Sequence, residues 1–363
     1  MANSTNPKQT SASKAGQVLL WPLTAIYGGI TRLRNHLYNI GYSKSLSFTP
    51  FIISVGNLSV GGTGKTPMIE YLTDWLTNAS YSVAILSRGY GRKTQGVRLA
   101  TSDDSADTLG DEPYQFYRKY HQQGVVVAVA EERVLGVPEI MHHHPKTQII
   151  LLDDAFQHRA IARDLNLLLT RYSRPFYQDW VLPAGRLRES RSGAKRADAV
   201  IVTKCPDDLD HNQQKIITEN IRKYTRTDTP VFFTGIHYGA PRPVFEGITM
   251  PEQVIAFSGI AHPELFQQYV RQHFLTKECI TFADHYRYTE NDIKKLSERA
   301  RQEDERVCFM TTEKDMVKMI NSPLADQWKA LPLFYLPIQS YFLQEETAFQ
   351  TWVTHQMTTS TQS

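Results

Sequence analysis

The sequence predicts an α/β protein: a parallel β-sheet flanked by helices, a second, smaller α/β domain, and an amphipathic helix near the N-terminus. Short apolar runs alternate with helical patterns along most of the chain, and runs that are apolar throughout are typical of parallel strands buried on both faces. A polar stretch rich in Asp, Lys and Thr, residues 206–229, divides these runs into two series. A chain of 363 residues is long enough for two such domains.

The composition excludes several classes of protein. Apolar residues make up 41% and charged residues 21%, so the chain is neither disordered nor fibrous. Forty Lys and Arg against 37 Asp and Glu leave a net charge of +3, too balanced for a dedicated nucleic-acid-binding protein. The three cysteines, at 205, 279 and 308, are too scattered for a disulfide framework or a zinc site and fit a reducing compartment. The sequence contains no run of 18 apolar residues, so we expect no simple membrane-spanning helix. No feature of the sequence indicates an obligate protein partner.

Residues 1–45 are predicted to form a tail followed by a helix. Apolar residues recur there at spacings of three and four, which predicts a helix with one apolar face. They are Leu19, Leu23, Ile26, Ile30, Leu33 and Leu37. Pro22 should then lie near the first turn. Six basic residues and no acidic residue precede Glu70. The stripe at 18–38 therefore has two interpretations: it packs on the protein core, or it lies in the interface of an anionic membrane with its cations near the headgroups.

The apolar runs also predict the domain boundaries. The first series predicts the strands of the larger domain, residues 46–228, at 51–55, 82–86, 125–129, 148–153, 165–169 and 199–203. The second series predicts the smaller domain, residues 229–345, with strands at 231–236, 254–258, 279–282, 307–311 and 333–336. Residues 346–363 are rich in Ser, Thr and Gln and are expected to form a polar, frayed tail.

The strongest chemical signal is a glycine-rich segment between the strand 51–55 and a helical pattern that contains Met68. This context predicts a P-loop NTPase-type sheet, in which backbone N–H groups of the segment and the helix N-terminus bind phosphates. We expect Lys65 to reach the β- and γ-phosphates and the Thr66 hydroxyl to hold Mg²⁺. Ser59 replaces the first glycine of the usual pattern. The residues that follow it are Val60, Gly61, Gly62, Thr63, Gly64, Lys65 and Thr66.

A pair of carboxylates supports a nucleotide site. The apolar run 149–152 ends in Asp153 and Asp154, a Walker B pattern that places acids at the carboxyl end of a strand beside the P-loop. Adjacent carboxylates on an extended strand point apart, so one should face the metal directly while the other acts through water or has another role. Many GTPases read guanine with [NT]-K-x-D after a strand, but Thr203-Lys204-Cys205-Pro206 has proline at the aspartate position. ATP is therefore the expected nucleotide.

Further short motifs follow the P-loop in order. They are Ser87-Arg88-Gly89-Tyr90-Gly91-Arg92, Gly110-Asp111-Glu112-Pro113, Asp153-Asp154-Ala155-Phe156-Gln157-His158, Leu182-Pro183-Ala184-Gly185-Arg186-Leu187-Arg188-Glu189, Ser258-Gly259-Ile260-Ala261, Asp284-His285-Tyr286 and Thr312-Glu313-Lys314-Asp315. Together with Gly56-Asn57-Leu58 and the P-loop, this series resembles the tetraacyldisaccharide 4′-kinase family, the lipid A 4′-kinases of Gram-negative bacteria. That family typically lacks the first Walker glycine. The matches run from about residue 20 to about residue 340.

The resemblance implies transfer of the γ-phosphoryl group of ATP to the 4′-hydroxyl of a tetraacyldisaccharide 1-phosphate, a lipid A precursor, to form lipid IVA. It implies a location at the cytoplasmic face of the bacterial inner membrane, peripheral or monotopic. Because such a substrate is taken from the bilayer, the resemblance favours the interfacial interpretation of residues 18–38.

The resemblance also implies roles for single residues. The family's catalytic aspartate matches Asp111 and its histidine partner matches His285, so the two would form a dyad in which Asp111 accepts the hydroxyl proton. They lie in different predicted domains, and we expect nucleotide and lipid binding to close the cleft between them. Guanidinium forks suit phosphate oxygens. Gln157 and His158 follow a strand end and either line the same cleft or form a turn, and Glu189 would assist the metal or the nucleotide. These candidate substrate contacts are Arg88, Arg92, Arg186, Arg188, Glu189, Gln157 and His158.

Two other classes of function stay open. A P-loop NTPase that couples hydrolysis to a conformational change needs only the P-loop and the Walker carboxylates, but it leaves Asp111, His285 and Arg188 without a role. A noncatalytic adaptor on a lipid surface needs only the basic N-terminal helix, but it leaves the P-loop without a role.

Overall fold

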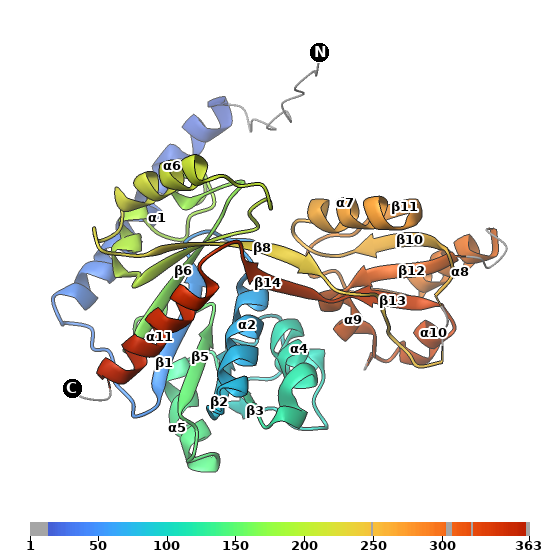
Figure 1. The fold of residues 1–363 in the computed structure, drawn as a ribbon, viewed down its shortest axis with the longest axis horizontal. Coiled ribbons are helices and arrows are strands. Elements are labelled where there is room, and N and C mark those ends of the chain that lie inside the picture. The colour runs from blue at the N-terminus through green and yellow to red at the C-terminus, as the bar shows by residue number, and fades with distance from the viewer. Residues whose placement is uncertain (1–13, 248–249, 303–306, 321, 361–363) are drawn as a thin grey trace.

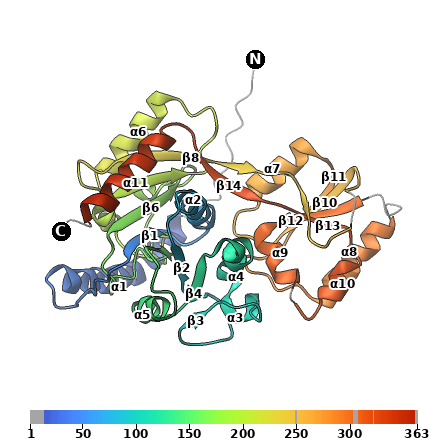
Figure 2. The ribbon, with the colours of Figure 1, turned by 60° about the horizontal axis from the view of Figure 1, so that its bottom comes forward.

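The computed structural model describes residues 14–247, 250–302, 307–320 and 322–360, and within these ranges the chain forms two sheets (Figures 1 and 2). The larger sheet has nine strands in the order β14-β8-β7-β6-β1-β5-β2-β4-β3. In chain order they are β1 (Phe51–Asn57), β2 (Val83–Ser87), β3 (Arg98–Leu99), β4 (Val126–Val129), β5 (Ile149–Asp153), β6 (Leu165–Arg171), β7 (Ala199–Thr203), β8 (Val231–Tyr238) and β14 (Ile338–Phe342).

The six strands predicted for the larger domain are confirmed, and they pair in parallel. Every residue of β2 and β5 is buried, as their unbroken apolar sequences indicate. Alternate side chains point to opposite faces, so Ile53 and Val55 of β1 belong to one hydrophobic cluster and Ile52 to another. β1 pairs with β5 on one side and with β6 on the other, so the segment after β1 starts from the middle of the sheet.

Helices cover both faces of the larger sheet (Figure 1). On one face Leu72, Phe116 and Phe349 join the core, and on the other face Ile140 and Ile221 do so. The first layer consists of α2 (Lys65–Asn78), α4 (Asp111–Tyr120) and α11 (Glu346–Ser360), and the second of α5 (Arg133–His143) and α6 (His211–Arg222). We call this sheet and these helices the larger unit.

The division of the chain differs from the predicted one at β8 and β14. Both strands lie within residues 229–345, which were expected to form the smaller domain, yet both belong to the larger sheet. β8 pairs in parallel with β7 and antiparallel with β14. Phe232 of β8 and Phe342 of β14 are buried in the core of the larger unit, which explains why the strands remain there.

The predicted frayed tail is also wrong, because residues 346–360 form the helix α11. Phe349, Val353 and Met357 are buried against the sheet. They are spaced by four residues and so lie on one face of the helix. The Thr and Gln residues between them make the segment polar in composition, but three apolar residues on one face are enough to pack it on the core.

The second sheet has five strands in the order β11-β10-β12-β13-β9. The strands predicted at 254–258, 307–311 and 333–336 are confirmed, and the one predicted at 279–282 begins earlier, at Leu275. The elements are β9 (Arg242–Pro243), β10 (Gln253–Ser258), β11 (Leu275–Thr281), β12 (Val307–Thr312) and β13 (Leu333–Leu336), with α7 (Glu264–His273), α8 (Glu290–Gln302), α9 (Glu313–Ile320) and α10 (Ala325–Lys329). We call them the smaller unit.

The two units are joined by the chain and by packing. The chain leaves the larger sheet through β8 and returns through β14 (Figure 1). Leu109, at the end of α3 (Ala106–Leu109), and Tyr114 of α4 pack with Met316 and Val317 of α9. This apolar contact places the start of α4 against the smaller unit.

α1 (Lys14–Asn39) is the helix that the apolar spacing predicts. It begins earlier than expected, so Pro22 lies inside the helix and not in its first turn. Its apolar stripe is mostly exposed: Ile26 is 62%, Ile30 63% and Leu33 61% exposed. The interpretation that the stripe packs on the core is therefore wrong. Among the helices that the structure describes, none is both long and apolar enough to cross a bilayer.

Candidate active site

A cavity of about 890 Å³ is lined by both units and gathers most of the predicted site residues. The larger unit contributes the P-loop, the carboxyl ends of β2 and β5 and the start of α4, and one side of α1 also reaches the cavity. Predicted residues that line it are Val60, Gly61, Gly62, Thr63, Gly64, Lys65, Thr66, Arg88, Asp111, Asp153, Asp154, Gln157, His158, Arg188, Glu189 and His285. Three predicted residues do not line it: Ser59, Arg92 and Arg186.

The P-loop connects β1 to α2. Gly61, with φ of 103°, and Gly64, with φ of 83°, adopt a backbone conformation that side chains with a Cβ rarely adopt. Ser59 is not among the residues with positive φ, so serine fits where the usual motif has glycine. It instead forms a β-bridge with Leu187, which ties the start of the loop to residues 186–188.

Asp154 is held by two cations. Arg188 donates to both of its carboxylate oxygens at 2.9 Å, and Lys65 Nζ lies 3.6 Å from Oδ1. Burial opposes ionisation of Asp154, but Lys65 and Arg188 outweigh it and hold the pKa below its ordinary value. Asp154 also has a positive φ of 49°, so the chain leaves the extended conformation of β5 directly after Asp153. Of the two Walker carboxylates, Asp154 is thus the one that orients the site's cations.

Asp153 is buried, with 2% of its surface exposed, and only one of its oxygens is bonded. Oδ2 accepts a hydrogen bond from Ser87 at 2.5 Å, whereas Oδ1 has no hydrogen-bond partner in the described part of the chain. Burial, then the charges of Glu112 and Asp154, raise the pKa of Asp153 to about 7. A divalent cation would satisfy Oδ1 and favour the ionised form.

Asp111 and His285 meet in the cavity, with 3.1 Å between Asp111 Oδ2 and His285 Nδ1. Asp111 is the first residue of α4, where the helix dipole favours a carboxylate. Lys314 Nζ lies 3.3 Å from His285 Nε2 and donates to it, so the ring proton is assigned to Nδ1, which donates to Asp111. Lys318 Nζ lies 4.0 Å from Asp111 Oδ2. The pair is therefore assembled in this structure, and at this point the two units are already close enough for Asp111 and His285 to form a hydrogen bond.

Two of the predicted arginines have other partners. Arg92 forms an ion pair with Glu131 at 2.6 Å, and its buried side chain is not free to bind phosphate. Arg186 Nη1 lies 3.4 Å from Nε2 of His262, beside the P-loop. Arg88 does line the cavity, and within the described ranges no hydrogen bond or ion pair holds its guanidinium. Arg88 thus stays a candidate phosphate contact.

Glu189 and Gln157 belong to a network that reaches α1. Glu189 accepts hydrogen bonds from Asn35 of α1 at 2.6 Å and from Arg196 at 2.6 Å. Gln157 donates to Glu189 at 3.0 Å and to the carbonyl oxygen of Asn57 at 2.9 Å. Because donors already occupy both Glu189 oxygens, this geometry favours a role in fixing α1 over a role at the metal.

His158 lines the cavity as a neutral side chain. Burial, then the charges of Arg133 and Arg34, lower its pKa to about 4. A histidine that is neutral at physiological pH offers a hydrogen bond to substrate but no positive charge for a phosphate.

Among the cavity-lining residues that sequence reasoning missed are Glu112, Lys314, Lys204 and His262. Lys314 donates to Glu112 at 3.1 Å and links α9 to α4 next to the dyad, and its charge holds the pKa of Glu112 below its ordinary value. Glu112 and Lys314 both stand in motifs that match the family: Glu112 follows Asp111, and Lys314 belongs to the last motif. Their place in these motifs was a signal that could have identified them. Lys204 stands in the incomplete guanine motif, and only the fold brings His262 to the P-loop.

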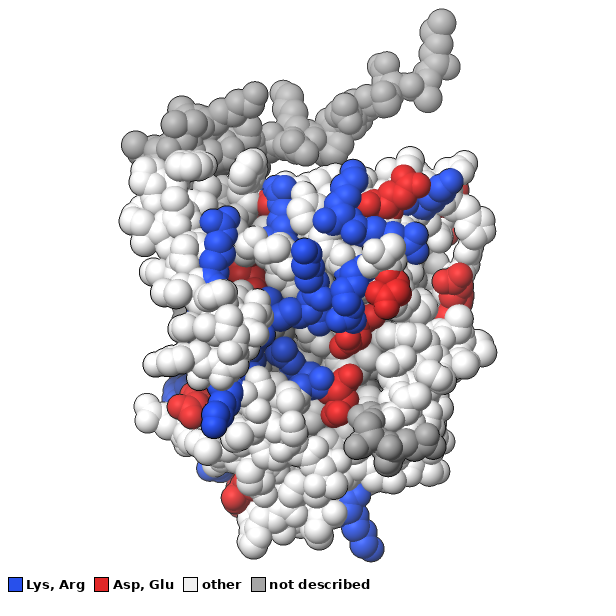
Figure 3. Space-filling model, turned by 90° about the vertical axis from the view of Figure 1, so that its left-hand side faces the viewer, with Lys and Arg blue, Asp and Glu red and all other residues white. Residues whose placement is uncertain are grey.

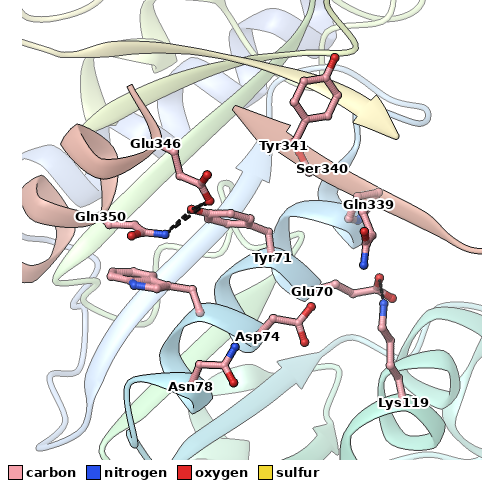
Figure 4. Close-up of a pocket in the computed structure, with 12 residues that line it drawn as sticks. Glu70, Tyr71, Asp74, Asn78, Lys119, Gln339, Ser340, Tyr341, Glu346 and Gln350 are labelled. Carbon is pink, nitrogen blue, oxygen red and sulfur yellow. Dashed lines mark hydrogen bonds and ion pairs between the residues drawn. The ribbon is translucent and has the colours of Figure 1, made fainter. Parts of the chain in front are cut away.

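A buried ion pair behind the site joins the two helices that start at Lys65 and Asp111 (Figure 4). Glu70 of α2 is 2% exposed and accepts hydrogen bonds from Lys119 at 2.6 Å and Gln115 at 2.8 Å, both on α4. The pair therefore fixes the spacing between the P-loop helix and the helix of the dyad. Burial, then the charge of Glu313, raise the pKa of Glu70 to about 7.

Glu70 is expected to make stability fall as pH rises. Its folded-state pKa of about 7 exceeds the ordinary value of 4.5. The contribution of Glu70 to the free energy of unfolding is therefore fully present below pH 4.5 and is lost as pH rises through 7. A shift of this size corresponds to about 3 kcal/mol. Glu70→Gln should therefore gain stability relative to wild type between pH 5 and pH 8, measured by urea unfolding. Glu219→Gln changes an exposed residue of α6, so its free energy of unfolding should differ from that of wild type by the same amount at every pH. If the difference between Glu70→Gln and wild type is also independent of pH, the raised pKa of Glu70 is contradicted.

Comparison with known proteins points to one family. A model of that family, described as tetraacyldisaccharide-1-P 4′-kinase, matches residues 16–358. The tetraacyldisaccharide 4′-kinase of Cytophaga hutchinsonii is 43% identical over 331 residues, covering 89% of this chain and 91% of the relative. The tetraacyldisaccharide 4′-kinase of Flavobacterium psychrophilum is 42% identical over 347 residues, covering 94% of this chain and 97% of the relative. The structure of "apo" form LpxK from Aquifex aeolicus in complex with ATP matches with a TM-score of 0.73 at 29% identity, covering 94% of this chain and 99% of that chain.

Proposed function

Because the chain belongs to the tetraacyldisaccharide 4′-kinase family, we propose that its cavity transfers the γ-phosphate of ATP to the 4′-hydroxyl of a tetraacyldisaccharide 1-phosphate. The protein is an ATP-dependent kinase of lipid A biosynthesis. One observation carries the assignment of this activity to the cavity: the P-loop lysine Lys65, the carboxylates after β5 and the Asp111–His285 pair all line it. A simple NTPase would need no such pair.

In this proposal Asp111 is the general base. Its carboxylate takes the proton of the 4′-hydroxyl as that oxygen attacks the γ-phosphorus, and the bond to the β–γ bridging oxygen breaks so that ADP leaves with the electron pair. His285 orients the carboxylate through the hydrogen bond from its Nδ1–H. Lys65 contacts the β- and γ-phosphates, and Arg88 and Arg188 offer further positive charge along the cavity. Asp111 belongs to the larger unit and His285 to the smaller unit. We therefore assign the general base to the boundary between the two units.

The residues present fit a Mg²⁺ ion. Asp153 Oδ1 is a buried carboxylate oxygen without a partner in the described residues, and the Thr66 hydroxyl lines the same cavity. We assign direct contact to Asp153 and Thr66, while Asp154 holds Lys65 and Arg188 in place. No group of three or more His, Cys, Asp or Glu side chains in the described chain is arranged around a metal, so phosphates and water would complete the shell. When bound, Mg²⁺ neutralises phosphate charge during transfer.

We assign α1 to the cytoplasmic face of the inner membrane. Its polar side is bonded to the site: Tyr27 donates to the carbonyl oxygen of Arg188 at 3.0 Å, and Asn35 donates to Glu189. Its other side exposes the apolar stripe, including Trp21 at 63%. The left-hand side of the molecule in Figure 1, where α1 lies, carries a central cluster of Lys and Arg (Figure 3). An apolar ridge beside a basic surface suits an anionic leaflet. Residues of α1, among them Tyr27 and Arg34, also line the cavity.

Incubation with γ-labelled ATP, Mg²⁺ and the detergent-dispersed tetraacyldisaccharide 1-phosphate tests the proposal. We expect labelled phosphate on the 4′ position of the lipid. Chelation with EDTA should abolish the transfer and added Mg²⁺ should restore it, because the metal neutralises the phosphates. Release of free phosphate without labelled lipid would indicate an uncoupled NTPase, and neither product would indicate an adaptor.

A further inference from the structure

We propose that Lys204 holds the nucleoside end of the donor nucleotide, on the side of the P-loop opposite to the transferred phosphate. The inference rests on the proposed use of the P-loop as the ATP site. It adds a residue that none of the family motifs contains.

The strand order defines the two sides of the P-loop. β1, which precedes the loop, has β5 on one side and β6 followed by β7 on the other. All four strands are parallel, so their carboxyl ends lie along one edge of the sheet. Asp153 ends β5, and its neighbour Asp154 pairs with Lys65, which marks the γ-phosphate side. Lys204 follows β7, on the opposite side. A nucleotide with its γ-phosphate near β5 therefore extends its ribose and base over β6 toward Lys204.

Contacts also tie the end of β7 to the P-loop. Thr203 donates its hydroxyl to the carbonyl oxygen of Thr63 at 2.8 Å. A methyl group at Gly62 would lie 3.9 Å from Lys204 Nζ and 3.9 Å from Cδ2 of His262, which belongs to the smaller unit. The ammonium of Lys204 thus lies beside the backbone of the loop, where the smaller unit also approaches.

Lys204 is a cavity-lining cation that has no direct partner among the residues that the structure describes, although the charge of Glu264 acts on it from a distance. In the described ranges it has no hydrogen-bond or ion-pair partner, although it is half-buried in the cavity wall. Burial, then the charge of Arg171, lower its pKa to about 8. Its φ of 58° is left-handed, a strained conformation that Asp154 and His285 share in the same cavity. A ligand that accepts hydrogen bonds from the ammonium would complete this arrangement.

The sequence around Lys204 is half of a nucleotide-binding motif. Thr203 and Lys204 fill the first two positions of [NT]-K-x-D, while Pro206 removes the carboxylate that reads guanine. The methylene stem of a lysine packs on apolar surface such as a base, and its ammonium donates to ribose oxygens. Lys204 would therefore support the nucleoside without reading the base.

Binding of two ligands tests the inference. ATP and inorganic tripolyphosphate are titrated into the full-length wild type, Lys204→Met and Lys215→Met, an exposed lysine of α6. Lys204→Met should weaken ATP binding by about 10–100-fold, the loss expected for a hydrogen bond from a charged group. Its tripolyphosphate affinity should stay within about twofold of wild type, because the contact is with the nucleoside. In the kinase assay its KM for ATP should rise more than its kcat falls. Lys215→Met should resemble wild type for both ligands.

Three results would overturn the inference: equal loss for both ligands, unchanged ATP affinity, or an effect on tripolyphosphate alone. Lys204→Arg keeps the charge and should restore most of the ATP affinity, whereas a defect in folding would not respond to charge. The outcome is also separate from the proposed function. A protein that shows this binding pattern but labels no lipid would refute the kinase assignment and leave the role of Lys204 standing.

Discussion

Replacing Asp111 by asparagine is expected to lower kcat for lipid phosphorylation by about 10²–10⁴-fold, the usual contribution of a general base. The amide keeps the size of the side chain and an oxygen that accepts from His285, but it cannot take the hydroxyl proton. The KM for ATP should change little, because in the proposed mechanism Asp111 meets the reacting hydroxyl and not the bound nucleotide. Steady-state kinetics with ATP and lipid varied in turn measure both constants.

Lys65→Met is the contrasting variant. Lys65 lies in the P-loop and lines the cavity. In the proposed mechanism it contacts phosphate in both the ground state and the transition state, so ATP affinity and kcat should both fall. Asp103→Asn, at an exposed carboxylate before α3, is the matched control for Asp111 and should keep wild-type kinetics. A comparable loss of ATP affinity in Asp111→Asn and Lys65→Met would argue against separate roles.

The second large effect is expected at α1, where Ile26→Asp combined with Ile30→Asp should release the protein from vesicles that contain anionic lipid. Each aliphatic side chain buried fully in the interface contributes about 1.5–3 kcal/mol. Each cation near the leaflet contributes about 1 kcal/mol and is screened over about 8 Å at physiological salt. High salt should therefore weaken binding of the wild type without abolishing it. Flotation of vesicles measures the bound fraction.

Two acceptors separate membrane docking from folding in this double variant. It should lose phosphorylation of lipid presented in a bilayer and keep that of a short-chain, water-soluble acceptor, because Ile26 and Ile30 are exposed and do not line the cavity. Leu265→Asp combined with Leu275→Asp, at exposed positions of the smaller unit, is the control and should stay bound. Loss of activity on both acceptors with a lowered melting temperature would mean that the double variant is misfolded, and it would contradict a role of these two side chains in membrane docking alone.

The sequence by itself determined the features that depend on neighbouring residues. The P-loop, the Walker carboxylates and the parallel strands are visible because each is a run of adjacent residues whose periodicity or backbone requirement is local. The spacing of apolar residues likewise predicted α1. Local spacing did not say whether the stripe of α1 is buried, because an amphipathic helix looks the same on a core and on a membrane.

The tertiary structure decided what depends on residues far apart in the chain. Asp111 and His285 are 174 positions apart, and only the packing of α4 on α9 brings them within 3.1 Å. Asp154 is distinguished from Asp153 by the distant cation Arg188. Lys204 acquires its place beside the P-loop from the order of the strands, which no local pattern encodes. The physical reason is the same in each case: the energies of ion pairs, burial and packing depend on distances that exist only after the chain has folded.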